Sequence, residues 1–236
     1  MNGNKNFVSR LWQQIQRDIR VVFERDPAAK SVAEVLFCYS GLHAIWLHRL
    51  AHFLYKRDFV LLPRLISNFT RFVTGIEIHP GAVIGDGLFI DHGTGIVIGE
   101  TAVLGKNVTL YQGVTLGGTG KEKGKRHPTL GNNVVVATGA KVLGSFTVGD
   151  HAKIGAGSVV LKEVPPYATV VGIPGRVVVM NGKRVYEEPA DELAAEKDVD
   201  LDHCALPDPE GDFARSMGEQ IRLLEEKVAL LEKKLK

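Results

Sequence analysis

An aliphatic residue recurs every six positions through the middle of the chain, between residues 78 and 160. The pattern slips by two positions after residue 96 and is interrupted at 117–128 before it resumes. A period of six fits neither a 3.6-residue helix nor a simple alternating strand. It predicts a solenoid whose short flat sides each send one aliphatic side chain inward. The three registers are Ile78, Ile84, Ile90 and Ile96; then Ile98, Leu104, Leu110 and Leu116; then Leu130, Val136, Val142, Val148, Ile154 and Val160.

Glycine often follows the aliphatic residue, as at Gly85, Gly105 and Gly149. It suits the corners of a solenoid because it tolerates positive φ. With three hexads to a coil, the registers predict roughly five coils, whose backbones pair at about 4.8 Å. Each coil buries its apolar side only on its neighbours, so both ends of the stack need caps. We therefore expect a mainly β fold, with a parallel β-helix over 74–186 that expels the interruption 117–128 as a loop.

The residues before the β-helix, 1–73, carry apolar positions at helical spacing. A first helix is predicted to end at Asp26-Pro27, because proline cannot continue a helix. A second helix is predicted over 31–55, and a third over 64–73, which Pro63 opens. We expect this helical domain to cap the first coil and to contribute to an oligomer contact.

Two segments of different composition follow the β-helix. Residues 187–216 are acidic and contain proline, which predicts a linker. Residues 217–236 carry apolar residues on a heptad, which predicts a short parallel coiled coil or an amphipathic helix folded back on its own chain. The heptad positions are Ile221, Leu224, Val228, Leu231 and Leu235.

Composition narrows the function classes. The net charge of +2 does not indicate nucleic acid or a membrane surface as a partner. No apolar stretch reaches the roughly 18–20 residues that span a bilayer, and the first ten residues lack the apolar core of a signal peptide. Cys38 and Cys204 lie far apart and form neither a disulfide framework nor a metal-ligand cluster. We expect a cytoplasmic protein.

Two parts of the β-helix carry candidate chemistry. The loop 117–128 is rich in glycine and lysine, so it could close over an anionic ligand. Asp91 and His92 follow an inward aliphatic residue, so at least one of them is expected to project outward at a corner. Histidine is the natural general base near neutral pH. Its orienting carboxylate could be Asp91 or Glu77, which lies fifteen residues earlier, close to one coil away.

Several longer runs carry a family resemblance. They are 75–80, 90–101, 112–121, 126–128, 153–161 and 172–176, together with 25–28. In these runs, which lie within roughly 20–180, the chain closely resembles the serine O-acetyltransferases, hexapeptide-repeat acyltransferases with a left-handed β-helix. The resemblance implies transfer of an acetyl group from acetyl-CoA, as co-substrate, to the hydroxyl of L-serine for cysteine biosynthesis. It implies no metal.

The resemblance also implies residue roles. His92 corresponds to the catalytic base and Glu77 to the carboxylate that orients it, a position often occupied by Asp. The implied serine-binding residues are Asp26, Asp91, Arg126 and His127, and the implied CoA-binding residues are Gly118, Thr119, Thr138 and Ala156. Direct transfer in a ternary complex is expected, because neither cysteine falls in a family run.

The resemblance implies partners as well. L-Cysteine is the expected feedback inhibitor, and a homotrimer or a dimer of trimers is the expected assembly. Trimers contrast with the heptad residues, which favour dimers. Long members of the family end in an isoleucine that docks into cysteine synthase, whereas this chain ends Leu235-Lys236, which argues against that complex.

Three alternatives remain open from the residues alone. A hexapeptide acetyltransferase for sugars or xenobiotics would share the β-helix and CoA but lack the serine-binding set. A γ-type carbonic anhydrase would use His79, His92 and His127 as zinc ligands. A non-catalytic trimeric scaffold would use the coiled coil to bind partners.

Overall fold

Three parallel sheets form the three faces of a prism in the computed structural model, and the chain passes from one face to the next at each corner. The first face contains β1 (Glu77–Ile78), β4 (Val97–Ile98), β7 (Thr115–Gly117), β10 (Lys141–Leu143) and β13 (Val159–Val160). The second face contains β2 (Val83–Ile84), β5 (Val103–Leu104), β8 (Thr129–Leu130) and β11 (Thr147–Val148). The third face contains β3 (Phe89–Ile90), β6 (Thr109–Leu110), β9 (Val135–Val136), β12 (Lys153–Ile154) and β14 (Ala168–Val171), which β15 (Arg176–Met180) and β16 (Lys183–Arg184) extend with antiparallel pairing.

The structure describes residues 2–120, 123–185, 217–218, 221–222 and 224. The predicted linker 187–216, Cys204 and the end of the chain lie outside these residues. Only five residues of the predicted heptad segment are described, and all five are helical. The coiled coil therefore stays a prediction.

The aliphatic residues of the hexads fill the interior of the prism, as the sequence predicts. Ile98, Leu104, Leu110 and Leu116 are each at most 2% exposed. They stack on the equivalent residues of neighbouring coils, as in the pairing of Ile98 with Leu116. The core is therefore a column of aliphatic layers closed by the coils above and below.

The slip of two positions in the hexad pattern has a structural cause. The corner between β3 and β4 holds six residues, 91–96, whereas the equivalent corner of the next coil, between β6 and β7, holds four, 111–114. Ile96 is buried but lies in this corner rather than in a strand, so its place in the first register is wrong. The two additional residues enlarge the corner that carries His92.

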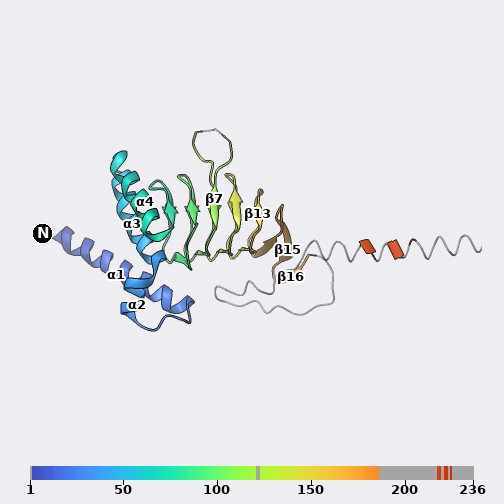
Figure 1. Cartoon of the computed structure of the whole chain (residues 1–236), viewed down its shortest axis with the longest axis horizontal. Coiled ribbons are helices and arrows are strands. Elements are labelled where there is room, and N and C mark those ends of the chain that lie inside the picture. The colour runs from blue at the N-terminus through green and yellow to red at the C-terminus, as the bar shows by residue number, and fades with distance from the viewer. Residues whose placement is uncertain (1, 121–122, 186–216, 219–220, 223, 225–236) are drawn as a thin grey trace, which may run out of the picture.

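Four helices gather at the N-terminal end of the prism: α1 (Asn2–Arg25), α2 (Val32–Cys38), α3 (Ser40–Tyr55) and α4 (Leu61–Thr74) (Figure 1). The second predicted helix is wrong as a single element, because Tyr39 has φ −93° and ψ 96° and divides it into α2 and α3. The third begins earlier than predicted, with Pro63 inside its first turn, where proline is tolerated.

The helices pack directly on the first coil. A Cβ at Gly41 of α3 would lie 2.4 Å from the carbonyl oxygen of Ile90, so glycine permits this close approach. The hydroxyl of Ser67 on α4 donates to the carbonyl of Ile78 over 2.7 Å. The helix α4 ends at Gly75, whose φ of 72° suits a left-handed C-cap. These contacts cap the edges of the first and third faces.

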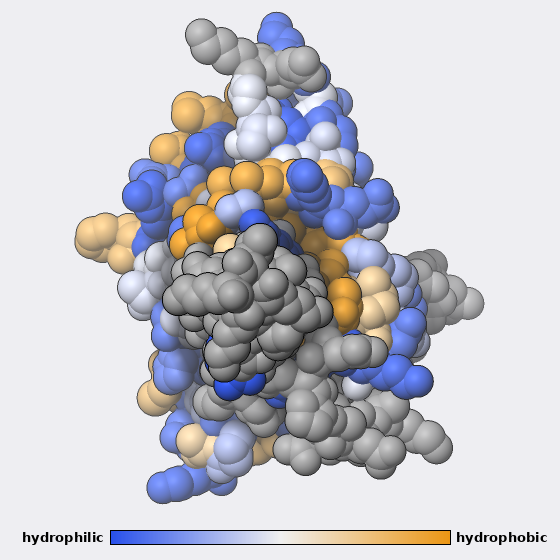
Figure 2. All heavy atoms as spheres, turned by 90° about the vertical axis from the view of Figure 1, so that its right-hand side faces the viewer, coloured by the Kyte–Doolittle hydropathy of each residue, from blue (hydrophilic) through white to orange (hydrophobic). Residues whose placement is uncertain are grey.

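The opposite end of the prism is covered by the β14–β16 strands. Figure 2 shows this end of the molecule, where apolar and hydrophilic residues both lie on the visible surface. Leu161 and Ile173 are exposed apolar residues of this region, at 51% and 67% exposure. Within the described residues, no helix has the length and hydrophobicity that crossing a membrane requires.

Candidate functional site

The corner where the third face turns into the first, here called the His92 corner, spans residues 91–96 in the first coil. The backbone N–H of Gly93 donates to the carbonyl of Asp91 over 2.6 Å, and that of Thr94 donates to the carbonyl of His92 over 3.0 Å. His92 has φ 58°, which is uncommon for a residue with a Cβ. Its side chain is 73% exposed and therefore accessible to a ligand.

Two carboxylates lie near this corner, with different contacts. The Asp91 Oδ1 atom lies 3.8 Å from His92 Nε2. The Glu77 Oε2 atom lies 3.0 Å from Nη1 of Arg71, the basic residue in the last turn of α4. Among the residues that the structure describes, no hydrogen bond joins Glu77 to His92. The role of Glu77 as the orienting carboxylate stays a prediction.

Asp26 lies at the His92 corner of its own chain. Its Oδ2 atom accepts a hydrogen bond from the Tyr39 hydroxyl over 2.5 Å, and its Oδ1 atom accepts from the backbone N–H of Ala28 over 2.8 Å. Burial and this hydrogen bond raise the pKa of Tyr39, and Asp91 adds to the increase. The carboxylates of Asp26 and Asp91 therefore face the same phenol, and the segment before α2 supplies one of them.

The corner where the first face turns into the second, here called the Arg126 corner, includes the loop 118–128. Nη2 of Arg126 donates to Oε2 of Glu100 over 2.5 Å. The hydroxyl of Tyr55, at the end of α3, donates to Oε1 of the same carboxylate over 3.2 Å. The hydrogen bond from Arg126 is the main reason that the pKa of Glu100 is lowered.

His127 is buried at this corner and is held by Thr101. The Thr101 hydroxyl lies 2.9 Å from His127 Nδ1, and its oxygen accepts the backbone N–H groups of Arg126 and His127. The backbone N–H of Thr101 also donates to Nδ1, over 3.2 Å, which leaves the proton of the neutral ring on Nε2. Burial and the charge of Arg126 lower the pKa of His127. A Cβ at Gly99 would lie 2.0 Å from Nε2, so the ring occupies the space that glycine leaves.

The predicted CoA residues are divided between the two corners. Gly118 and Thr119 are exposed at the start of the loop, directly after β7. Thr138 and Ala156 lie in later coils, at the corner where the third face turns into the first. The loop also carries Lys125, whose ammonium donates to the carbonyl of Thr101 over 2.7 Å.

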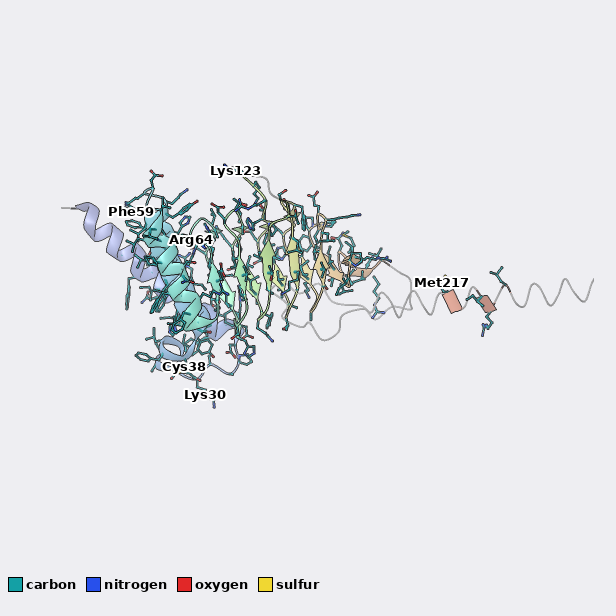
Figure 3. The ribbon with its side chains drawn as sticks, turned by 45° about the horizontal axis from the view of Figure 1, so that its top comes forward. Lys30, Cys38, Phe59, Arg64, Lys123 and Met217 are labelled. Carbon is teal, nitrogen blue, oxygen red and sulfur yellow. The ribbon has the colours of Figure 1, made fainter. Side chains whose placement is uncertain are left out.

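The predicted serine-binding residues are divided in the same way. Asp26 and Asp91 lie at the His92 corner, and Arg126 and His127 lie at the Arg126 corner, so the two groups flank opposite edges of the first face. In Figure 3, Lys123 of the loop points away on the side opposite to Lys30, which precedes α2. One chain therefore does not bring all four residues together.

The three histidines of the zinc alternative are also separated. His79 and His127 lie at the Arg126 side of the first face, whereas His92 lies at the other corner. In the described part of the chain, no group of three His, Cys, Asp or Glu side chains is arranged to hold a metal ion.

Four residues that shape the site have no role predicted from the sequence. Glu100 and Thr101 fall inside a run that carries the family resemblance, so their polarity beside an inward Ile98 was a usable signal. Tyr39 lies at the break between α2 and α3 and Tyr55 ends α3, and both contact the site only through tertiary packing. No sequence spacing indicates those contacts.

A parallel β-helix with an enlarged, histidine-bearing corner and an expelled basic loop is the architecture of a hexapeptide-repeat transferase. Residues 127–162 match the family model "Bacterial transferase hexapeptide (six repeats)", and residues 6–46 match "Serine acetyltransferase, N-terminal". The chain is 60% identical to a serine acetyltransferase of Bacillus subtilis, over 95% of this chain and 97% of the relative. The chain belongs to the serine acetyltransferase family, whose members are acyltransferases with a left-handed β-helix.

Solved structures support the same assignment. The Neisseria gonorrhoeae serine acetyltransferase in complex with serine is 44% identical, with a TM-score of 0.69 over 72% of this chain and 70% of that one. The Brucella abortus enzyme in complex with Coenzyme A is 44% identical, with a TM-score of 0.69 over 72% and 68%. A serine acetyltransferase in complex with cysteine is 45% identical, with a TM-score of 0.69 over 72% and 66%.

Proposed function

We propose that this protein transfers the acetyl group of acetyl-CoA to the hydroxyl of L-serine and so forms O-acetylserine for cysteine biosynthesis. The observation that carries the proposal is the His92 corner, where an exposed imidazole lies 3.8 Å from the Asp91 carboxylate and where Asp91 and Asp26 both raise the pKa of Tyr39. An imidazole beside fixed carboxylates is suited to remove a proton from an amino-acid substrate whose ammonium group those carboxylates attract.

The charges of the two corners complement a zwitterionic amino acid. Asp26 and Asp91 would bind the ammonium group, and Arg126 would bind the carboxylate through its guanidinium donors. His127, with its ring proton on Nε2, would add a neutral donor near the same carboxylate. A substrate held at both ends presents its hydroxyl in one orientation. This positioning contributes to the rate of the reaction.

His92 would act as the general base in a direct transfer. Its imidazole takes the hydroxyl proton as the serine oxygen bonds to the thioester carbon. The tetrahedral adduct then collapses, the carbon–sulfur bond breaks, and the imidazolium returns the proton to the departing CoA sulfur. General-base assistance of this kind contributes about 10²–10⁴-fold in rate. Glu77 would stabilise the imidazolium from the adjacent strand.

Acetyl-CoA would bind along both corners, at Gly118, Thr119, Thr138 and Ala156. Gly118 and Thr119 are exposed at the start of a loop that carries the exposed Lys123, so backbone N–H groups and an ammonium group can meet phosphates there. At the other corner Ala156 is exposed and Thr138 is half-buried, and their small side chains leave room for an extended ligand.

The site would be completed between chains of a homotrimer. A threefold axis facing the first face brings the His92 corner of one chain against the Arg126 corner of the next. The apolar side of α4 supports this arrangement, because α4 continues the first face through the Ser67–Ile78 hydrogen bond. Its unburied apolar residues are Leu61, Leu62, Leu65, Phe69, Phe72 and Val73. A monomer rarely exposes so large an apolar surface.

L-Cysteine would inhibit by occupying the serine site. It differs from serine only by a thiol in place of the hydroxyl, so the same carboxylates and guanidinium would hold it. Its inhibition is expected to be competitive with serine.

The test is the release of free CoA from acetyl-CoA, with and without L-serine. Wild type and a His151→Ala control, whose substitution lies at the remaining corner of the prism, are expected to release CoA in a serine-dependent manner. His92→Ala is expected to lose about 10²–10⁴-fold of that activity while remaining folded. Absence of serine-dependent release from folded wild type would overturn the proposal, and amino sugars would be the next acceptors to assay.

A further inference from the structure

The last residue of α3, Tyr55, reaches from the helical region to the Arg126 corner. Its hydroxyl donates to Oε1 of Glu100 over 3.2 Å, and Arg126 donates from Nη2 to Oε2 of the same carboxylate over 2.5 Å. Each oxygen of Glu100 therefore serves a different partner. The Glu100 and Arg126 side chains are 32% and 30% exposed, so the pair is only partly screened by water.

Two contacts with the first coil support Tyr55. Its ring meets the His79 ring edge-on, with centroids 5.9 Å apart and planes at 82°. One turn earlier on α3, His52 Nδ1 lies 2.7 Å from the carbonyl oxygen of Pro80, which ties the helix to the first coil. The phenol is therefore presented to Glu100 from a helix end that is anchored on both sides.

The phenol also keeps its proton. Burial and the hydrogen bond to Glu100 raise the pKa of Tyr55, whereas the bond from Arg126 lowers the pKa of Glu100. The pair thus consists of a neutral donor and an ionised acceptor over the whole neutral range. A hydrogen bond to an ionised carboxylate is stronger than one between neutral groups.

We propose that Tyr55 is a positioning residue that orients Arg126 through Glu100, so that Arg126 is held ready for the carboxylate of the substrate. The inference rests on the proposed function, in which Arg126 binds that carboxylate. With Oε1 engaged by Tyr55, Glu100 contacts the guanidinium through one oxygen only. Nη1 donates to the carbonyl of Gly124 over 3.4 Å, and the guanidinium N–H groups that neither partner engages stay available to a second carboxylate.

Loss of the phenol would change this balance. Glu100 would be free to turn and to pair with Arg126 through both oxygens, which is the geometry that the substrate carboxylate also uses. Serine would then compete with an internal carboxylate for the same donors. Binding of serine would therefore weaken. The rate of the chemical step would stay the same, because the general base, His92, lies at the other corner.

The test is Tyr55→Phe, with Tyr167→Phe as the matched control, since Tyr167 stacks on His151 away from both groups. Tyr55→Phe is expected to raise KM for serine about 3- to 10-fold, the cost of one lost hydrogen bond to a charged group. The kcat and KM for acetyl-CoA are expected to stay within about twofold, and the control is expected to match wild type in all three constants.

A double-mutant cycle tests the route through Glu100. In a Glu100→Ala background, adding Tyr55→Phe is expected to change KM for serine no further, because the intermediate group is gone. An unchanged KM for serine in folded Tyr55→Phe, or an equal effect of Tyr55→Phe in the Glu100→Ala background, would overturn the inference. Absence of serine-dependent CoA release in wild type would instead overturn the proposed function.

Discussion

At the scale of single residues, the site depends on where the backbone permits or excludes a side chain. His92 holds φ 58° and Gly93 holds φ 76°, and a Cβ at Gly93 would lie 2.5 Å from the Ile76 side chain. These values let the corner fold tightly and present the imidazole outward. At the Arg126 corner, Gly99 leaves the space that the His127 ring fills.

Gly99→Ala is expected to lower turnover with serine by about 10²-fold, because a displacement of about 1 Å at a bound group has that effect. A Cβ at this position would lie 1.9 Å from His127 Cδ2, so the ring must move. The measurement is kcat/KM for serine, with the thermal midpoint as the control for folding. Wild-type turnover from Gly99→Ala would contradict the position given to His127.

His48 makes the stability of the helical region depend on pH. Burial, followed by the nearby charges of His52 and Arg49, lowers the pKa of His48 to about 3. The unfolded chain takes up the proton near pH 6.5, before the folded chain does, so stability is complete above that pH and is lost as the pH falls. The free energy of unfolding is expected to fall by about 1.4 kcal/mol per pH unit between about 6.5 and 3 from this group.

Urea unfolding at pH 7.5 and 5.0 measures this loss. His48→Gln is expected to reduce the difference between the two pH values, whereas His43→Gln, on the same helix, is expected to leave it as in wild type. An equal pH dependence in wild type and His48→Gln would contradict the assignment.

At the scale of elements, the break between α2 and α3 matters most. The apolar pattern over 31–55 predicts one helix, but Tyr39 leaves the helical region and its hydroxyl reaches Asp26. The break turns α3 so that Gly41 contacts the first coil and Tyr55 contacts the Arg126 corner. A short helix, α2, remains, and it depends on its cap.

Ser31→Ala is expected to lower the free energy of unfolding by about 1 kcal/mol, as N-cap replacements commonly do. The Ser31 hydroxyl accepts the backbone N–H of Glu34 over 3.1 Å, and the Glu34 carboxylate accepts the backbone N–H of Lys30 over 2.9 Å. Chemical denaturation measures the change, and Ser31→Asp, which retains a cap acceptor, is the control. Equal stability of Ser31→Ala and wild type would show that the cap contributes nothing.

At the scale of the whole molecule, the two corners lie on opposite edges of one face. Each corner carries part of the predicted serine set and part of the predicted CoA set. The two corners are separated by the topology, because one corner precedes each strand of the first face and the other corner follows it. If the His92 corner of one chain meets the Arg126 corner of the neighbouring chain, a single site contains all of these residues.

Co-expression of His92→Ala and Arg126→Ala chains tests this arrangement. Each variant alone is expected to be nearly inactive. Randomly mixed trimers are expected to recover up to about a quarter of wild-type activity, because one in four interfaces then pairs an intact His92 with an intact Arg126. The control is a mixture of His92→Ala and Glu77→Ala chains, which are altered at the same corner. The activity of these mixed trimers is expected to be no higher than the activity that their Glu77→Ala chains contribute.

If mixed His92→Ala and Arg126→Ala chains, shown to co-assemble, stay as inactive as the separate variants, each site lies within one chain. The same measurement therefore separates a shared site from a site built at one corner. It does not depend on which acceptor the enzyme prefers, provided that wild type is active.

The sequence by itself determined the β-helix, because a hexad period leaves only one set of residues able to face the interior, and Ile98, Leu104 and Leu116 occupy it. It also determined the exposed His92 corner, since the slip of two positions requires an enlarged turn. Only the tertiary structure decided which residues meet at each corner. Tyr39 on Asp26, Tyr55 on Glu100 and the division of the serine set arise from packing between segments far apart in the chain, where no local period applies.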